Sequence, residues 1–157
     1  MNITLLAIGK TDDPALQELI DRYRQRLSHY VNFEFQVLPD IKQAKNRSEA
    51  QQKILEGQEL LKRIQPSDQM ILLDEKGTAY SSVKFSAFLQ KKMNSGLKNL
   101  VFVIGGPYGF SEEVYARAQG KVALSAMTFS HQMVRLFFVE QVYRGYTILR
   151  NEPYHHR

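Results

Sequence analysis

A glycine-rich segment that follows an apolar run has the residue types of a ligand-binding loop. Residues 100–104 are all apolar, residues 105–109 read Gly-Gly-Pro-Tyr-Gly, and Ser111 with two glutamates after it is typical of a helix start. Glycine permits positive φ and close approach of the backbone to a ligand. In α/β proteins such a loop at the carboxyl end of a strand meets nucleotide-like ligands, although the same glycines could simply turn the chain.

Three residues near the C-terminus are candidate proton acceptors, namely His131, Glu140 and His155. Imidazole suits general base catalysis because it titrates near neutral pH. Each of the three also has a simpler explanation. His131 follows a serine at a predicted helix start and could be a structural cap, and His155 could contact phosphate. Glu140 could form an i,i+4 ion pair with Arg144.

Other side chains in this region are suited to RNA. Arg135 and Arg144 could hold RNA phosphate or a carboxylate of a partner subunit. Tyr154 lies in a tail that we expect to be mobile before binding, and its ring could stack on a base. A basic segment elsewhere could contact phosphates, or could be only a soluble loop. Its members are Lys42, Lys45, Arg47 and Lys53.

The composition predicts one soluble domain over residues 1–157, because this length can bury a sizeable core and the chain has ordinary hydrophobic (43%) and charged (24%) fractions. Since there is no cysteine, a disulfide framework, a thiolate nucleophile and a cysteine-based zinc site are excluded. We expect no metal. The net charge of +5 favours a polyanionic partner modestly. The N-terminus lacks a signal peptide and no apolar run reaches membrane-spanning length, so we expect a cytoplasmic protein with no membrane partner.

Strands and helices are expected to alternate along the chain. The predicted strands cover residues 3–8, 33–38, 70–74, 100–104 and 122–125, and the predicted helices cover about 14–27, 48–64, 82–93, 111–119 and 131–149. Apolar strands that alternate with helices predict an α/β fold with a mostly parallel sheet covered on both faces. Residues 75–77 are expected to form a turn.

This arrangement positions the candidate ligand site. The strands that end near Leu73 and Ile104 should place their loops on one edge of the sheet, where residues 124–129 can join them. The last helix, 131–149, carries apolar residues on more than one side. Because its own sheet can cover only one side, we expect a homodimer to cover the other.

Several motifs, spread over the whole chain, together resemble one family. They are Leu73-Asp74, Ile104-Gly105-Gly106-Pro107-x-Gly109, Leu124-Ser125-x-Met127-Thr128-x-x-His131-x-x-x-Arg135, Glu140-Gln141-x-Tyr143-Arg144 and Asn151-x-Pro153-Tyr154-His155. The chain resembles the small bacterial SPOUT methyltransferases of the RlmH (YbeA) family, which act on N3 of a pseudouridine in 23S ribosomal RNA.

This resemblance implies a SPOUT-type α/β knot, in which the C-terminal segment threads through a loop to form a trefoil knot. It also implies a homodimer, 23S rRNA in the ribosome as substrate, and S-adenosyl-L-methionine as cofactor. Carried over by position, the cofactor contacts are Leu73, Gly105, Leu124, Ser125, Ala126, Met127, Thr128 and Phe129. The candidate catalytic residues are Glu140, Arg144, Tyr154 and His155. Either His156 or Arg157 could supply a further cation in the tail.

The chemistry implied by the resemblance is compatible with this composition. Methyl transfer from a sulfonium to an imide nitrogen is an in-line displacement that needs alignment and loss of the N3 proton, and it requires no covalent intermediate. Two other classes compete with an enzyme of this kind. A non-catalytic RNA-binding or ribosome-associated factor could share the fold. Another α/β nucleotide-binding enzyme is disfavoured, because no G-x-x-x-x-G-K-[ST] loop or G-x-G-x-x-G opening a helix is present.

Overall fold

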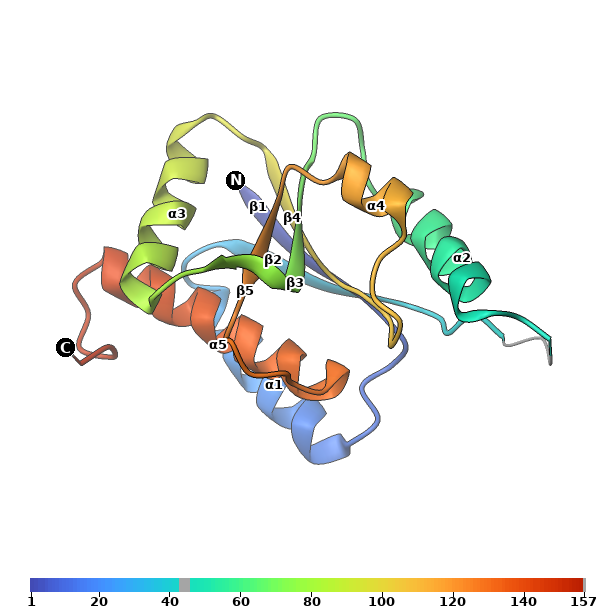
Figure 1. The fold of residues 1–157 in the computed structure, drawn as a ribbon. Helices are drawn as coiled ribbons and strands as arrows, with labels where there is room; N and C mark the ends of the chain where they lie inside the picture. Colours follow the sequence, from blue (N-terminus) through green and yellow to red (C-terminus); the bar gives the residue numbers. More distant parts are fainter. Residues whose placement is uncertain (43–45, 157) are drawn as a thin grey trace.

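The computed structural model describes residues 1–42 and 46–156, and its strands and helices alternate along the chain (Figure 1). The strands are β1 (Asn2–Ile8), β2 (Asn32–Leu38), β3 (Gln69–Ala79), β4 (Asn99–Ile104) and β5 (Gly120–Ala123). The helices are α1 (Pro14–Leu27), α2 (Glu49–Leu61), α3 (Ser82–Asn94), α4 (Glu112–Arg117) and α5 (His131–Leu149). Two residues considered for RNA contacts, Lys45 and Arg157, lie outside the described residues.

The strands form one sheet in the order β2-β1-β4-β3-β5, and every neighbouring pair is parallel. Strand β4 lies in the middle, between β1 and β3, and all but the first of its residues are buried. Its continuous apolar sequence is therefore that of a strand covered on both faces. The predicted α/β class with a parallel sheet is confirmed.

Two groups of helices cover the two faces of the sheet (Figure 1). Helices α1, α3 and α5 pack on one face, where Phe102 lies in the same core cluster as Phe138 of α5. Helices α2 and α4 pack on the other face, where Val103 shares a cluster with Leu60 and Val114. Because side chains alternate along a strand, neighbouring residues of β4 supply the two cores. Each large apolar side chain buried in this way stabilises the fold by about 1.5–3 kcal/mol.

Each of these helices begins at a residue whose side chain accepts a hydrogen bond from the first turn, and these residues are Asp13, Ser48, Ser81, Ser111 and Ser130. Ser48 and Gln51 form a capping box, in which Ser48 Oγ accepts from Gln51 N at 3.1 Å and Gln51 Oε1 accepts from Ser48 N at 2.9 Å. An N-cap of this kind contributes about 1 kcal/mol. The polar residues before each helix therefore fix where it begins.

The predicted turn over residues 75–77 is wrong, because β3 continues through it to Ala79. Both Leu73 and Thr78 pair with Val122 of β5. The residues between them therefore form an irregularity in β3 for which β5 has no matching residues. Gly77 permits this close pairing, since a Cβ there would lie 2.6 Å from the backbone of Lys121 and of Val122. Strand β5 also begins and ends earlier than predicted, so residues 124 and 125 already belong to the following loop.

The substitution Gly77→Ala is expected to lower the free energy of unfolding by roughly 1–3 kcal/mol, because the new methyl group would overlap backbone atoms of β5. Chemical denaturation measures this loss. The matched control is Gly120→Ala in the paired strand, where the nearest atom to a new Cβ is Ile71 Cδ1 at 3.4 Å and little change is expected. Equal losses in the two variants would contradict this account of Gly77.

Candidate active site

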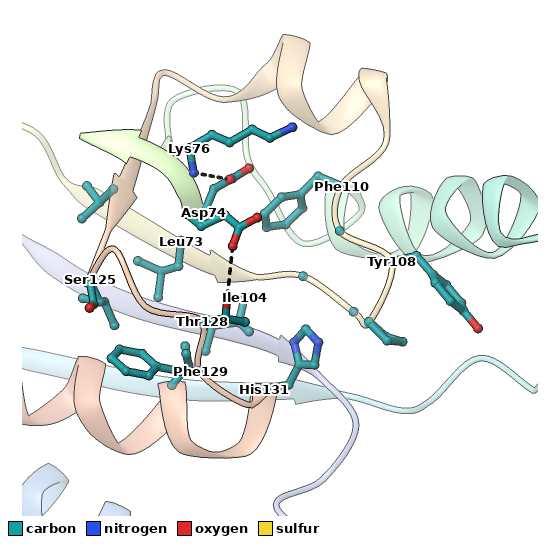
Figure 2. Close-up of a pocket in the computed structure, with 18 of the residues that line it drawn as sticks. Leu73, Asp74, Lys76, Ile104, Tyr108, Phe110, Ser125, Thr128, Phe129 and His131 are labelled. Atoms are coloured by element: carbon teal, nitrogen blue, oxygen red, sulfur yellow. Dashed lines mark hydrogen bonds between the residues drawn. The ribbon is translucent and has the colours of Figure 1, made fainter. Parts of the chain in front are cut away.

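Three loops meet at the carboxyl edge of the sheet. Leu73 of β3 pairs with Ile104 of β4 on one side and with Val122 of β5 on the other. Since the three strands are parallel, the segments that follow them emerge side by side. The prediction that these loops share one edge is confirmed. A cavity of about 540 Å³ lies among them (Figure 2).

The cavity is lined mainly by the segments that had been predicted to bind the cofactor. Seven predicted cofactor residues line it, namely Leu73, Gly105, Leu124, Ser125, Met127, Thr128 and Phe129, whereas Ala126 does not. His131 and Val134 close the cavity from the first turns of α5. Tyr108, which belongs to the same loop as Gly105, points away from the other labelled residues in Figure 2. The volume is in the range of small-molecule sites.

Contacts between and within the loops fix their shape. Thr128 Oγ1 donates to Glu75 Oε2 at 3.4 Å, and this bond joins the loop over residues 124–129 to the segment after Leu73. Within the glycine loop, residues 105–109, the N–H of Gly109 donates to the carbonyl of Gly106 at 3.1 Å. Gly109 has φ +83°, which a residue with a side chain rarely adopts. The loop is therefore shaped by glycine conformation as well as by hydrogen bonds.

Carboxylates stand beside the apolar wall of the cavity. Asp74 accepts hydrogen bonds from Lys76 N at 2.8 Å and from the Tyr115 hydroxyl at 2.5 Å. Burial, together with the bond to Asp74, raises the pKa of Tyr115 to about 12, so that Tyr115 remains a donor at neutral pH. Asp74, Glu75 and Tyr115 all line the cavity. Carboxylates in such a position suit a ligand that carries hydroxyl groups or a positive charge.

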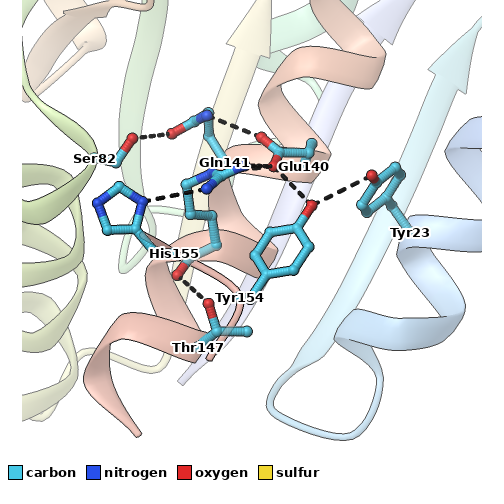
Figure 3. A network of polar contacts seen from close by, with 8 residues as sticks. Tyr23, Ser82, Glu140, Gln141, Thr147, Tyr154 and His155 are labelled. Carbon is cyan, nitrogen blue, oxygen red and sulfur yellow. Dashed lines mark hydrogen bonds and ion pairs between the residues drawn. The ribbon is translucent and has the colours of Figure 1, made fainter. Parts of the chain in front are cut away.

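A second group of polar side chains forms around the later part of α5 and the C-terminal tail (Figure 3). Glu140 Oε1 accepts from Arg144 Nη2 at 2.7 Å and from the Tyr154 hydroxyl at 2.9 Å. Arg144 Nη1 lies 3.2 Å from His155 Nδ1, and the Tyr154 hydroxyl lies 3.3 Å from that of Tyr23. These five residues are called the tail network below. It brings together all four predicted catalytic residues, and the i,i+4 pair of Glu140 with Arg144 is confirmed.

The tail is anchored, so the expectation that it is mobile is wrong. Glu152 donates its N–H to the Thr147 carbonyl at 2.9 Å and accepts from the Tyr30 hydroxyl at 2.5 Å. Tyr154 lies with the Arg144 guanidinium 4.7 Å from its ring centre. Burial raises the pKa of Tyr154 above its ordinary value, and the hydrogen bonds to Tyr23 and Glu140 act in the same direction. The chain folds back because its tail has hydrogen-bonding partners on both α1 and α5.

The cavity and the tail network occupy different parts of α5. His131 lines the cavity at the beginning of the helix. Glu140 comes nine residues later, which places it about 14 Å farther along the helix axis at 1.5 Å per residue. Of the candidate proton acceptors, His131 is thus at the cavity, whereas Glu140 and His155 lie in the tail network. One copy of the chain therefore does not bring the cavity and the tail network together.

The prediction that Arg135 contacts RNA or a partner is wrong, because this side chain is 1% exposed. Its Nη2 donates to the Ile8 carbonyl at 2.9 Å, its Nη1 to Thr11 Oγ1 at 3.0 Å and its Nε to the His131 carbonyl at 3.2 Å. Burial lowers the pKa of Arg135, while the carboxylates of Asp12 and Asp40 oppose that effect. Arg135 therefore fastens the start of α5 to the end of β1.

Comparison with known proteins identifies the family. Residues 1–155 match the family model described as "Predicted SPOUT methyltransferase". The chain belongs to the SPOUT methyltransferase family. It is 67% identical to "Ribosomal RNA large subunit methyltransferase H" of Flavobacterium johnsoniae and 65% identical to the protein of that name in Flavobacterium psychrophilum, with 100% of both chains covered in each case. It is 59% identical to the protein of the same name in Parabacteroides distasonis, with 99% of each chain covered.

Membership of the SPOUT methyltransferase family confirms the predicted fold family and the methyltransferase class. Within residues 1–42 and 46–156, none of the helices combines the length and apolar character that a membrane span requires. The same part of the chain has no group of three or more histidine or acidic side chains placed to hold a metal ion.

Several residues of this SPOUT methyltransferase that had not been predicted to bind the cofactor also lie at the cavity. Asp74 belongs to the Leu73-Asp74 motif, and its position directly after Leu73 was the signal available in the sequence. Lys53 comes from α2 and Tyr115 from α4, and both line the cavity. Lys53 had been considered for phosphate contacts, but no local pattern marks Lys53 or Tyr115 as a cavity residue, because only the packing of α2 and α4 on the sheet brings them there.

Replacing Arg135 by Met is expected to lower the free energy of unfolding by roughly 2–4 kcal/mol, since the Ile8 carbonyl and Thr11 hydroxyl would lose a charged donor inside the protein. Equilibrium denaturation provides the measurement. Arg22→Met is the control, because Arg22 makes only an exposed pair with Glu18, and a change within about 0.5 kcal/mol is expected. A stable Arg135→Met protein that binds RNA poorly would show that Arg135 contacts RNA after all.

Proposed function

We propose that this methyltransferase transfers a methyl group from S-adenosyl-L-methionine to N3 of a pseudouridine in 23S rRNA of the large ribosomal subunit, in the cytoplasm. The observation that carries the proposal is the cavity formed by three adjacent loops at the carboxyl edge of the sheet in a chain of this family. Relatives that match over the full length are named for methylation of large-subunit ribosomal RNA. That name supports the choice of substrate.

The cavity suits the proposed cofactor in size and lining. Leu73, Gly105 and the loop over 124–129 would hold it, with apolar side chains against its flat base and backbone groups toward its polar atoms. Asp74 and Glu75 supply negative charge beside the cavity, which suits ribose hydroxyls and a cationic ligand. The cofactor supplies an electrophilic methyl group on a positively charged sulfur.

The tail network is proposed to prepare the acceptor base. N3 of the base must lose its proton, and Glu140 and His155 are the groups in the network that could accept it. Arg144 bonds to Glu140 through both Nε and Nη2, so its guanidinium holds that carboxylate in a fixed orientation. Tyr154 donates to the same carboxylate oxygen.

A homodimer would bring the network of one copy to the cavity of the other. The two groups are separated along α5 within one chain, and α5 leaves Met133 (39%) and Phe137 (38%) exposed four residues apart. Burial of this stripe against a second copy would favour association. We further propose that the C-terminal segment is threaded through a loop as a trefoil knot, an arrangement with which the side-by-side loops are compatible.

The basic character of the chain supports an RNA partner. The net charge is +5, and Lys42 and Arg47 lie in the segment that leads into α2. Lys53 of α2 lines the cavity itself. Positive charge close to the cavity would favour binding of the phosphates that flank the target base.

The proposed function is tested with labelled S-adenosyl-L-methionine and ribosomes from a strain that lacks this gene, followed by nucleoside analysis of the large-subunit RNA. The expected product is labelled N3-methylpseudouridine. Gly105→Val should abolish cofactor binding, because a Cβ at Gly105 would already lie 3.1 Å from the Phe110 ring. Glu140→Gln should retain cofactor binding and lose methyl transfer.

The controls separate the competing functions. Gly120→Ala adds a methyl group away from the cavity and should bind cofactor and transfer methyl as the wild type does. Cofactor binding without methylation of the ribosome would point to another acceptor RNA. Absence of both from the wild-type protein would favour a non-catalytic RNA-binding factor on the same fold.

A further inference from the structure

A buried carboxylate on α2 is not explained by the proposed reaction. Glu56 is 4% exposed, and its Oε1 accepts from Gln52 Nε2 at 3.0 Å. Its other oxygen, Oε2, is buried and has no hydrogen-bond partner among the described residues. A buried carboxylate oxygen without a donor is costly, and native proteins contain few of them. Glu56 therefore calls for a functional explanation.

The unpaired oxygen faces the glycine loop. A Cβ built on Gly106 would overlap Glu56 Oε2 and lie 2.7 Å from Glu56 Cδ. Gly106 is not among the glycines with positive φ, so the close carboxylate, rather than the backbone conformation, excludes a side chain there. Gly106 lines the cavity and Glu56 does not. Glu56 can therefore act on a bound ligand only through the loop.

Gly57, the next residue of α2, lies against the other end of the segment over residues 106–111. A Cβ on Gly57 would lie 2.6 Å from Ser111 Oγ and 2.9 Å from Val114 Cγ2. Ser111 is the N-cap of α4, and its Oγ accepts from Val114 N. Two consecutive residues of α2 thus contact both ends of the segment from 106 to 111. Helix α2 therefore limits how closely residues 106–111 can approach it.

A chain of hydrogen bonds sets the orientation of the carboxylate. Arg47 Nη1 donates to Gln52 Oε1 at 3.1 Å, and the Gln52 amide donates in turn to Glu56 Oε1. Since Gln52 is also buried, the Glu56 side chain has little freedom to turn its free oxygen elsewhere. Oε2 is consequently held against the loop.

We propose that Glu56 is a positioning residue of the cofactor site. Its carboxylate sets the place of Gly106, and Oε2 accepts a backbone N–H of the glycine loop when the loop adjusts around the cofactor. Pairing of a buried, previously unpaired carboxylate oxygen then favours the cofactor-bound form of the loop. The inference rests on the proposed cofactor, and it adds a residue that touches neither cofactor nor RNA.

The test is calorimetric titration of the folded protein with S-adenosyl-L-methionine, well below the unfolding temperature. Glu56→Gln keeps the shape of the side chain but replaces one acceptor oxygen by an amide donor, and its Kd is expected to rise about tenfold. In turnover assays the KM for the cofactor should rise while kcat at saturation stays near that of the wild type. Glu59→Gln is the matched control, because Glu59 lies on the same helix in an exposed pair with Lys62 and its change should leave Kd unaltered.

A double-mutant cycle tests the contact itself. Gly106→Ala should weaken cofactor binding strongly in the wild-type background, because its methyl group meets the Glu56 carboxylate. In a Glu56→Ala background the same change should cost much less, since the obstructing group is gone. Additive effects of the two substitutions would overturn the proposed contact.

The failure of this inference can be told apart from failure of the proposed function. Wild-type and Glu56→Gln proteins that bind the cofactor with equal Kd, with only the unfolding temperature lowered, would show that Glu56 serves stability alone. A wild-type protein that does not bind the cofactor would overturn the proposed cofactor, and the role of Glu56 with it.

Discussion

The parallel pairing of β3 with β4 and β5 is the constraint on which the rest of the structure depends. Because the three strands run in one direction, their following segments are delivered to a single edge, and the cavity exists only there. The pairing in turn requires helices on both faces, since β4 is apolar on both sides. The same helices bring Lys53 and Tyr115 to the cavity and Glu56 to the glycine loop. The site is thus a consequence of how the sheet is covered.

Helix α5 runs from the cavity to the tail network, so it connects these two sites and also keeps them apart. Arg135 fixes its beginning to the end of β1, beside the cavity, while Glu140 and Arg144 join the tail on its later turns. A helix of this length does not shorten, so the separation of about 14 Å between His131 and Glu140 is built into the chain. The proposed reaction needs the cavity and the tail network at the same base. A second copy of the chain is the simplest source of the missing group.

Local patterns were enough to predict the elements whose structure is decided locally. The strands near 3–8 and 100–104, the start of the helix near residue 48, and the shared edge of the loops all follow from apolar runs and polar caps. Residues 75–77 were misassigned because Glu-Lys-Gly has the composition of a turn, whereas Leu73 before them and Thr78 after them both pair with β5, more than forty residues later, which keeps the strand continuous. Such pairing leaves no mark in the local sequence.

Arg135 and Glu56 show why charged residues were the hardest to place. Arginine and glutamate are mostly exposed, so a sequence alone favours a surface position for both. Arg135 is buried because a carbonyl at the end of β1 accepts a hydrogen bond from its guanidinium, and Glu56 is buried beneath a loop fifty residues away in sequence. Each depends on a contact between distant segments. The family resemblance pointed to the segments that line the cavity, but it carried no information on the residues behind them.

The central claim is that the cavity of one copy works with the tail network of another, and subunit complementation tests it most directly. A Gly105→Val subunit has a defective cavity and an intact network, and a Glu140→Gln subunit has the reverse. Heterodimers purified through two different affinity tags would contain one intact combined site, so they are predicted to recover about half of the wild-type methyl transfer although both parents are inactive. Heterodimers as inactive as the two parents would contradict the account, because they would show that each chain needs its own cavity and its own network.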